Sequence, residues 1–578
     1  MPFIFSGHME EITMNRTLPI GNDQFRLVRE KNEYYVDKSL FIKEFLEKKD
    51  TAALITRPRR FGKTLNMTML REFLDITRDS RKLFDGLNIM ETEYVKEMNS
   101  RPVVYFTFKD CTGNNPKELM QSVWNSIFQE YRRYYEIFEG TVDKKDLYYI
   151  QFYQTLQDGL EKKLDRTDLS FSIQYLLTAV CRFYGKEAVL LVDEYDQPVL
   201  CSYENEYREE MGDFFSAMYG AALKGNEYVS QALLTGIQRV AKESIFSKLN
   251  NLQVYSVVCK DYAGYFGMTA DETQKVLEHY GLGLTEEVRR KYNGYRFGGM
   301  DIYNPWSVLN YAKNKRLGDY WVNTSTNYLI RQSLGSAGNH FRKDFDRLIE
   351  EGETTAGVNL ETSFIELQDT QSLWGLLVNS GYVTVSDDTQ GHTVKHGPDR
   401  IDGRSHLRYD NTLMKMRIPN DEVRAELQKI VAEQAHISDD SLRGIFWYLQ
   451  NGDMEHFMSV YQEIVTSCTS YFDAKENAYH MLFLGMCISL RGLYKVTSNV
   501  EMGLGRSDIR LEALRLGLCH VLIEFKQGED IMKLKEEALR QIMDKQYYAG
   551  LEGRVLCIGI AHDKKMCRMA WEYVEVKS

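Results

Sequence analysis

The sequence predicts a multidomain α/β protein. The chain has 578 residues, which is too long for a single hydrophobic core, and this length favours roughly three to four domains. Short apolar runs separated by helical patterns indicate buried parallel strands at 52–56, 102–108, 188–192 and 232–235. A second α/β pattern fills the last hundred or so residues. Two α/β regions with a largely helical stretch between them are therefore expected.

The first region reads as a parallel sheet with helices on both faces. After the strand at 52–56, Leu65, Met69, Phe73 and Ile76 recur at helical spacing and form one apolar face. The other connections are also long enough for crossover helices, which parallel neighbours require.

The remaining regions are assigned from their patterns. Residues 271–350 look helical, residues 360–430 mix helix and short strands around a polar loop at 388–405, and residues 431–470 look helical again. In the last region we expect a helix at 476–491, strands near 492–500, 507–512 and 520–526, a helix at 531–549 and a strand at 554–560.

Composition favours a cytoplasmic protein without a membrane partner. Hydrophobic residues make up 43% and charged residues 27%, as in ordinary globular proteins. The longest mostly apolar stretch, near 481–490, is too short to span a bilayer, and no signal peptide is evident. The nine cysteines include no CxxC pair, which argues against a disulfide framework and against structural zinc.

The net charge of −11 disfavours attraction of the whole surface to nucleic acid. Any contact with DNA would have to come from a local basic patch or through a metal ion.

A phosphate-binding turn is predicted at 57–64, which reads RPRRFGKT. It follows an apolar strand, and Gly62, Lys63 and Thr64 open a helix, the arrangement that presents backbone N–H groups to phosphate. Lys63 would reach the β- and γ-phosphates, and Thr64 would bind Mg²⁺. Arg57 stands where the usual motif has glycine; Arg57, Arg60 and Gly62 complete the expected nucleotide contacts of the loop. The alternative is a helix that starts on a basic turn.

Two acidic residues support this interpretation. The run VLLVDEYDQP at 189–198 ends a buried strand in Asp193 and Glu194, which places both carboxylates at its carboxyl end. Asp193 would hold Mg²⁺ through water, and Glu194 would polarise the attacking water. The further strand at 102–108 fits ATPases in which a strand is inserted between the two Walker strands. The alternative is that acidic residues simply end a strand.

Two further residues are candidates for sensing the nucleotide. Thr235 ends the strand at 232–235, where a polar side chain could contact the γ-phosphate. Arg296, in the stretch expected to be helical, could close over the phosphates. The alternative for Thr235 is an ordinary strand end, and the alternative for Arg296 is an ordinary surface arginine; in each case the two interpretations are equally favoured.

A metal site is predicted near the C-terminus. Glu524 and Lys526 share one face of a strand, and Asp508 lies 16 residues before Glu524 on the strand expected to pair with it. Asp508, Glu524 and the Phe525 carbonyl would bind Mg²⁺ or Mn²⁺, and Lys526 would position or deprotonate the attacking water. A solvated ion pair is the alternative, but the preceding apolar run argues for burial, where charges need a partner or a metal.

Several segments together resemble the AAA-ATPase-like family, a group of prokaryotic proteins that commonly end in a PD-(D/E)XK nuclease-like domain. They are LPIGNDQF at 18–25, YYVDKSLFI at 34–42, RPRRFGKT at 57–64, LVDEYDQPV at 191–199, LLTGIQRVAKESIFSKLNNL at 233–252 and YNGYRFG at 292–298. Arginine at the first loop position is usual in that family. WVNTSTN at 321–327 and RIPNDEV at 417–423 also look like family signatures, with no chemistry attached.

The resemblance covers the chain from about residue 18 and implies more about sites and domains. Glu476 would complete the metal shell, and Gln541 would position substrate, with Lys545 and Tyr547 nearby; His480 is interpreted as a packing residue. The expected domains are an N-terminal extension (1–17), a P-loop ATPase domain (18–270), a helical lid (271–350), a winged-helix-like region (351–435) and a helical connector with the PD-(D/E)XK α/β domain (436–578).

The sequence thus favours an ATPase whose nucleotide site gates a Mg²⁺-dependent nuclease, acting on nucleic acid, with DNA preferred over RNA. The first alternative is a signalling or switch ATPase of a mobile-element or phage-defence system, whose C-terminal domain binds nucleic acid or protein without cleaving. A further hypothesis makes the winged-helix-like region a DNA-binding module. Homo-oligomerisation stays open, since no arginine finger in trans is identified.

Overall fold

The chain divides into two compact units, one formed by residues 1–341 and 355–422 and the other by residues 342–354 and 423–578. A computed structural model describes residues 16–239, 251–321, 330–334, 337–360, 369–386, 413–434, 439–467, 479–480, 482–483, 486–490, 493–502, 505–515 and 517–576.

The first unit is built on a five-stranded parallel sheet. Its strand order is β2 (Val103–Thr107), β3 (Ala188–Asp193), β4 (Val229–Gly236), β1 (Ala52–Thr56) and β5 (Leu252–Tyr255). Every residue of β1 and β3 is buried, which explains their continuous apolar runs. The strand inserted between β1 and β3 is β4, whereas the 102–108 segment forms the edge strand β2. The edge strand β5 was not predicted.

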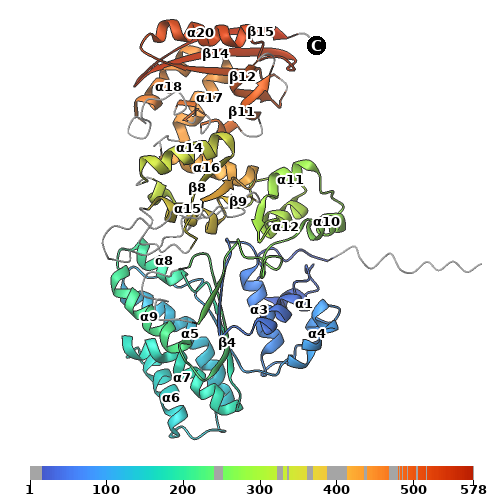
Figure 1. Cartoon of the computed structure of the whole chain (residues 1–578), viewed down its shortest axis with the longest axis vertical. Coiled ribbons are helices and arrows are strands. Elements are labelled where there is room, and N and C mark those ends of the chain that lie inside the picture. The colour runs from blue at the N-terminus through green and yellow to red at the C-terminus, as the bar shows by residue number, and fades with distance from the viewer. Residues whose placement is uncertain are drawn as a thin grey trace, which may run out of the picture. The chain divides into compact units, whose positions relative to one another are not determined.

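Helices cover both faces of this sheet. In Figure 1, α5, α6, α7 and α9 lie on one side of β4, and α1, α3 and α4 lie on the other. The bounds are α1 (Phe25–Glu30), α2 (Leu40–Lys48), α3 (Lys63–Leu74), α4 (Arg81–Phe84), α5 (Pro116–Phe138), α6 (Leu147–Leu160), α7 (Arg166–Tyr184), α8 (Gln197–Glu204) and α9 (Arg208–Leu223). In α3, Met69 and Phe73 are fully buried as expected, and the helix ends before Ile76.

The stretch expected to be wholly helical contains a β-hairpin. Helices α10 (Ala270–His279), α11 (Glu286–Tyr292) and α12 (Pro305–Asn314) are present, but β6 (Tyr295–Phe297) and β7 (Met300–Ile302) pair antiparallel between α11 and α12. Gly298 and Gly299 form the turn, both with positive φ, which glycine adopts without strain. The role of this region as a lid remains a prediction.

The middle region combines helices with a small sheet. A three-stranded sheet has the order β8 (Glu353–Gly357), β10 (Leu413–Arg417) and β9 (Thr384–Val385). The helices are α14 (Asn339–Glu351), α15 (Thr370–Ser380) and α16 (Asp421–Gln434). The polar loop expected at 388–405 lies outside the described residues, and the winged-helix-like assignment remains a prediction.

The second unit carries a five-stranded mixed sheet. Its order is β11 (Tyr494–Met502), β12 (Gly505–Ala513), β13 (His520–Gln527), β14 (Gly553–Asp563) and β15 (Met566–Val576); only β13 and β14 among these neighbours run parallel. Helix α20 (Ile531–Asp544) makes the crossover between β13 and β14, while α17 (Asp439–Asn451) and α18 (Met454–Ser467) precede the sheet. Strand β15 was not predicted. No helix in the described part of the chain is long and apolar enough to cross a bilayer.

Candidate nucleotide and metal sites

The phosphate-binding turn connects β1 to α3. Gly62 adopts a left-handed conformation with φ +82° at the N-cap of α3, which favours glycine. Lys63 is buried, and its Nζ donates hydrogen bonds to the carbonyl oxygens of Arg57 and Pro58, both at 3.2 Å. The ammonium group therefore lies inside the turn, next to the helix N-terminus, where phosphate would bind.

Asp193 lies at the centre of the acidic side of this site. Thr64 Oγ1 donates to Asp193 Oδ2 at 2.7 Å, and Thr235 Oγ1 donates to Asp193 Oδ1 at 2.6 Å. Burial, and next the charge of Glu194, raise the pKa of Asp193 to about 6. The carboxyl ends of β1, β3 and β4 thus bring together the three residues predicted from separate motifs.

Glu194 turns the chain sharply after β3. Its φ is +52°, a conformation that non-glycine residues rarely adopt and that costs about 1–3 kcal/mol. The next residue anchors the turn, because the Tyr195 amide donates to the Thr235 carbonyl at 3.0 Å. Glu194 Oε1 lies 3.5 Å from Lys63 Nζ, so the carboxylate predicted to polarise water faces the lysine predicted to bind phosphate.

A third acid, Asp196, was missed by sequence reasoning. It is buried, and its Oδ2 accepts hydrogen bonds from the amides of Ile237 at 2.8 Å and Gln238 at 2.9 Å. Burial, followed by the charge of Glu194, raises the pKa of Asp196 to about 6. The feature of the sequence that could have identified Asp196 is its position in the same acidic motif, two residues after Glu194. Asp196 joins the turn after β3 to the loop after β4.

The prediction that Arg57 contacts nucleotide is corrected. Its side chain has no exposed surface, Nη1 donates to the carbonyls of Thr56 and Tyr255 at 2.8 Å, and the guanidinium lies 5.4 Å from each ring centre of Phe266 and Phe297. Burial lowers its pKa to about 10. The Arg57 side chain therefore packs in the protein interior, where it connects the turn to Tyr255, Phe266 and Phe297, and it does not face the predicted phosphate position.

Arg296 is also placed differently from the prediction. Its strand neighbours Tyr295 and Phe297 pack on Phe61 of the turn, with ring centres 4.9 and 5.1 Å away. Because side chains alternate along a strand, Arg296 faces the opposite side, where its Nη1 pairs with Asp301 at 2.8 Å. The predicted closure of Arg296 over phosphate is therefore not consistent with this arrangement.

Arg60 lies on the exposed side of the turn with φ +71°. Its guanidinium stacks 4.1 Å from the ring centre of Trp306 on α12. A nucleotide contact by Arg60 remains a prediction.

The C-terminal site assembles on β12, β13 and α20. Glu524 Oε1 accepts a hydrogen bond from Lys526 Nζ at 3.0 Å and another from Gln541 Nε2. Asp508 Oδ2 accepts from the Phe525 amide at 2.8 Å. Gln541 Nε2 is also 3.0 Å from the Tyr547 hydroxyl oxygen. The two predicted acids, the lysine and the glutamine therefore lie in one cluster.

The donor set of this cluster fits a hard cation. Glu524 is 3% exposed, and its second oxygen, Oε2, is buried without a hydrogen-bond partner among the described residues. Burial, and next the charge of Asp508, raise the pKa of Glu524 to about 7. An unpaired buried carboxylate oxygen beside a second carboxylate suits an oxygen-seeking divalent ion.

Two further residues, Glu476 and His480, were predicted near this site. Glu476 lies outside the described residues. His480 Nε2 is 3.1 Å from the Asp508 carbonyl oxygen, and burial lowers the pKa of His480 to about 4. Within the described segments, no group of three or more His, Cys, Asp and Glu side chains is arranged to hold a metal.

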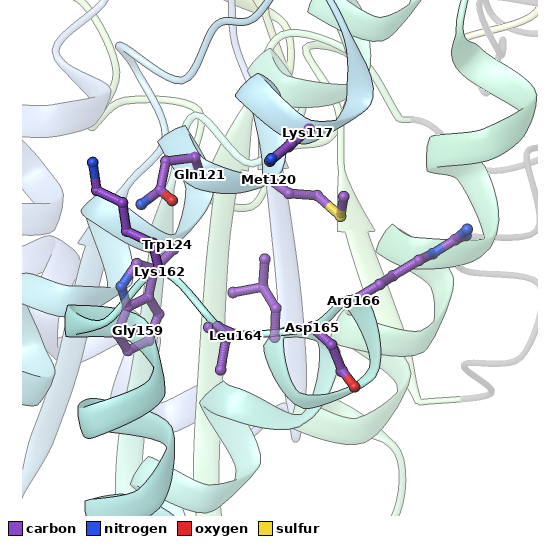
Figure 2. A pocket seen from close by; sticks show the side chains of 10 residues that line it. Lys117, Met120, Gln121, Trp124, Gly159, Lys162, Leu164, Asp165 and Arg166 are labelled. Carbon is purple, nitrogen blue, oxygen red and sulfur yellow. The ribbon is translucent and has the colours of Figure 1, made fainter.

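A separate pocket lies between α5 and the α6–α7 connection. Figure 2 shows the side chains of Lys117, Lys162 and Arg166 around it, with Trp124 and Leu164 also in its lining. None of its lining residues belongs to the predicted nucleotide or metal site.

Comparisons with known proteins match a family model to each of the two regions that carry these candidate sites. Residues 19–246 match the family described as "Predicted AAA-ATPase", and residues 474–572 match the PD-(D/E)XK nuclease superfamily. The chain is also similar to an "Uncharacterized protein in vnfD 5'region" of Azotobacter chroococcum mcd 1, with 27% identity over 417 residues, which are 72% of this chain and 69% of that protein.

Proposed function

We propose that this chain, which carries an AAA-ATPase-like domain at residues 19–246 and a PD-(D/E)XK nuclease superfamily domain at residues 474–572, is an ATPase whose nucleotide site gates cleavage of nucleic acid. The observation that carries the proposal is the hydrogen-bonded chain Thr64–Asp193–Thr235 at the carboxyl edge of the parallel sheet. These hydrogen bonds join the phosphate-binding turn at 57–64 to the acidic strand end at 189–198, the two motifs on which ATP hydrolysis would depend.

In the ATPase reaction, Lys63 binds the β- and γ-phosphates in place of the two loop carbonyls that it contacts in this structure. Thr64 and Asp193 would hold Mg²⁺, which neutralises phosphate charge. Glu194 orients and polarises the attacking water, and Thr235 keeps Asp193 in position.

In the cleavage reaction, Asp508, Glu524 and the Phe525 carbonyl would hold Mg²⁺ or Mn²⁺, which stabilises charge on the scissile phosphate. Lys526, held 3.0 Å from Glu524 Oε1, positions or deprotonates the attacking water. Gln541 fixes the Glu524 carboxylate and positions the substrate. DNA is the favoured substrate.

The test is incubation of the full chain with single- and double-stranded DNA and RNA, with Mg²⁺ or Mn²⁺, and with or without ATP. Asp508→Ala and Lys526→Ala should abolish cleavage, whereas Lys533→Ala, which removes an exposed lysine of α20, should not. Lys63→Ala should abolish ATP binding and the effect of ATP on cleavage, whereas Lys82→Ala at an exposed position should not.

Cleavage that survives both Asp508→Ala and Lys526→Ala would overturn the nuclease part of the proposal. ATP binding without turnover, and without an effect on cleavage, would instead favour a switch whose C-terminal domain binds nucleic acid or protein.

A further inference from the structure

The C-terminal end of α15 reaches the nucleotide site from outside the segment that matches the ATPase family. Gly381, with φ +87°, packs on the phosphate-binding turn so closely that a Cβ at this position would lie 3.0 Å from Pro58 Cβ. Two residues earlier, Asn379 Nδ2 donates to Gln238 Oε1 at 3.2 Å. One helix end therefore contacts the loop after β1 and the loop after β4.

Gln238 is tied to the catalytic turn through its backbone. Its amide donates to Asp196 Oδ2 at 2.9 Å, and its carbonyl accepts from the Tyr195 hydroxyl at 2.6 Å. These partners, Tyr195 and Asp196, are the first and second residues after Glu194. A displacement of Gln238 would therefore move the residues that hold Glu194 in its left-handed conformation.

The Asn379–Gln238 pair leaves hydrogen-bonding capacity unused in a buried place. The two residues are 1% and 3% exposed, yet Asn379 Oδ1 and Gln238 Nε2 have no partner among the described residues. A second bond, from Asn379 Nδ2 to the Leu360 carbonyl at 3.0 Å, fixes the orientation of the amide. Unpaired buried polar atoms cost about 1–3 kcal/mol each, so their retention calls for a function.

We propose that Asn379 and Gln238 are positioning residues of the ATP site. Asn379, supplied by α15, fixes the loop after β4, and this loop holds Asp196 and Tyr195 so that Glu194 can orient the attacking water. The inference rests on the proposed ATPase activity. According to this proposal, ATP hydrolysis requires α15 to be packed on the nucleotide site so that Asn379 contacts Gln238.

The test uses substitutions that keep shape and remove the amide, Asn379→Leu and Gln238→Met, singly and together in the full chain. Each should lower kcat for ATP about tenfold while KM changes less than about twofold, because the pair acts on the water-orienting turn and not on the phosphates. The double variant should be no slower than the slower single variant, since both residues act through one contact.

Ser380→Ala is the matched control, because Ser380 is buried beside Asn379 but its hydroxyl bonds only to the Leu376 carbonyl among the described contacts. It should keep wild-type kcat. Wild-type kcat in Asn379→Leu, additive losses in the double variant, or an equal loss in Ser380→Ala would each overturn the inference.

Failure of the proposed function is separable from failure of the inference. If the wild-type chain hydrolyses ATP and Asn379→Leu keeps wild-type kcat, the inference fails while the proposed ATPase activity stands. If the wild-type chain binds ATP without hydrolysing it, or does not bind nucleotide, the proposed ATPase activity fails and the inference, which rests on it, fails with it.

Discussion

Thr64 and Asp193 are separated by 129 residues along the chain, and their side chains are joined by a hydrogen bond of 2.7 Å. The bond links the first turn of α3 to the carboxyl end of β3. The two side-chain oxygens that we propose for Mg²⁺ are therefore adjacent in this structure.

Thr64→Ala is expected to weaken binding of ATP in the presence of Mg²⁺ by about tenfold or more, since an oxygen ligand is lost. Binding in EDTA should change little. Calorimetric titrations with and without Mg²⁺ measure the difference, and Thr64→Ser, which keeps the hydroxyl, serves as the control. Equal weakening in both buffers would contradict the assigned role.

Glu194→Gln should retain ATP binding and lower kcat for hydrolysis by about 10²- to 10⁴-fold, the usual contribution of a general base. The substitution preserves size and leaves Lys63 in the turn. Phosphate release under saturating ATP measures the effect, with Glu209→Gln at an exposed position of α9 as the control. Hydrolysis at the wild-type rate would assign the role of base to another residue.

Arg57→Ala is expected to destabilise the first unit by about 2–4 kcal/mol, because it removes buried packing, a cation–π contact and two hydrogen bonds. Urea unfolding measures the change in the free energy of unfolding. Arg60→Ala is the control: its exposed stacking on Trp306 should contribute at most about 1 kcal/mol. Loss of ATP affinity with unchanged stability would restore Arg57 as a nucleotide contact.

Sequence reasoning located the strand ends well because each is marked by an uninterrupted apolar run followed by a polar residue. Asp193 and Thr235 follow from this rule, whereas Thr64 follows from the GKT motif at the start of α3. Parallel pairing of β1, β4 and β3 then places the carboxyl ends of these strands side by side. Alternation of side chains along a strand placed Glu524 and Lys526 on one face of β13, and their spacing from Asp508 placed that residue on the paired strand.

Local sequence patterns did not predict which way a side chain points at a turn. The Arg57 side chain packs against Phe266 and Phe297, which lie more than 200 residues away in sequence. The sequence around Arg57 therefore does not indicate that its side chain is buried. The position predicted for Arg296 is wrong because the sequence analysis expects helix where Gly298 and Gly299 form the turn of a hairpin between two short strands of alternating apolar and charged residues. Asn379 reaches the site only through the tertiary placement of α15.

Divalent metal should stabilise the second unit. The carboxylates of Asp508 and Glu524 repel each other, and Glu524 Oε2 lacks a partner among the described residues, so a bound cation removes an electrostatic cost. Binding at one hundred times the dissociation constant adds about 2.7 kcal/mol to the free energy of unfolding. Thermal unfolding with Mn²⁺ or EDTA measures the effect.

Glu524→Gln should abolish this stabilisation by Mn²⁺, whereas Glu537→Gln, on the exposed side of α20, should keep it. An identical response to Mn²⁺ in wild type and Glu524→Gln would show that Glu524 does not hold the ion.

Glu422 connects two sequence signatures to which no chemistry is attached. It lies in the RIPNDEV segment and is 2% exposed; its carboxylate accepts from the amides of Tyr320 and Trp321, the start of the WVNTSTN segment, and from Ser307 Oγ at 2.8 Å. Glu422 therefore joins the RIPNDEV segment to Trp321, the first residue of the WVNTSTN segment, within the first unit.

Burial is the largest influence on Glu422 and raises its pKa from 4.5 to about 7. A raised carboxyl pKa means that stability is fully present below pH 4.5 and is lost as the pH rises through about 7, because the folded state then holds an unfavourable buried charge. The loss from this group amounts to about 3 kcal/mol. Glu422→Gln cannot ionise, and its amide oxygen can still accept from the two backbone amides.

The variant should therefore gain stability relative to wild type between pH 5 and pH 8, by most of that amount. Urea unfolding at the two pH values measures the difference, and Glu287→Gln on the exposed side of α11 should track the wild type. A wild-type pH dependence in Glu422→Gln would assign the titration to Asp193 and Asp196, the other buried carboxyls of this unit whose pKa values are raised to about 6.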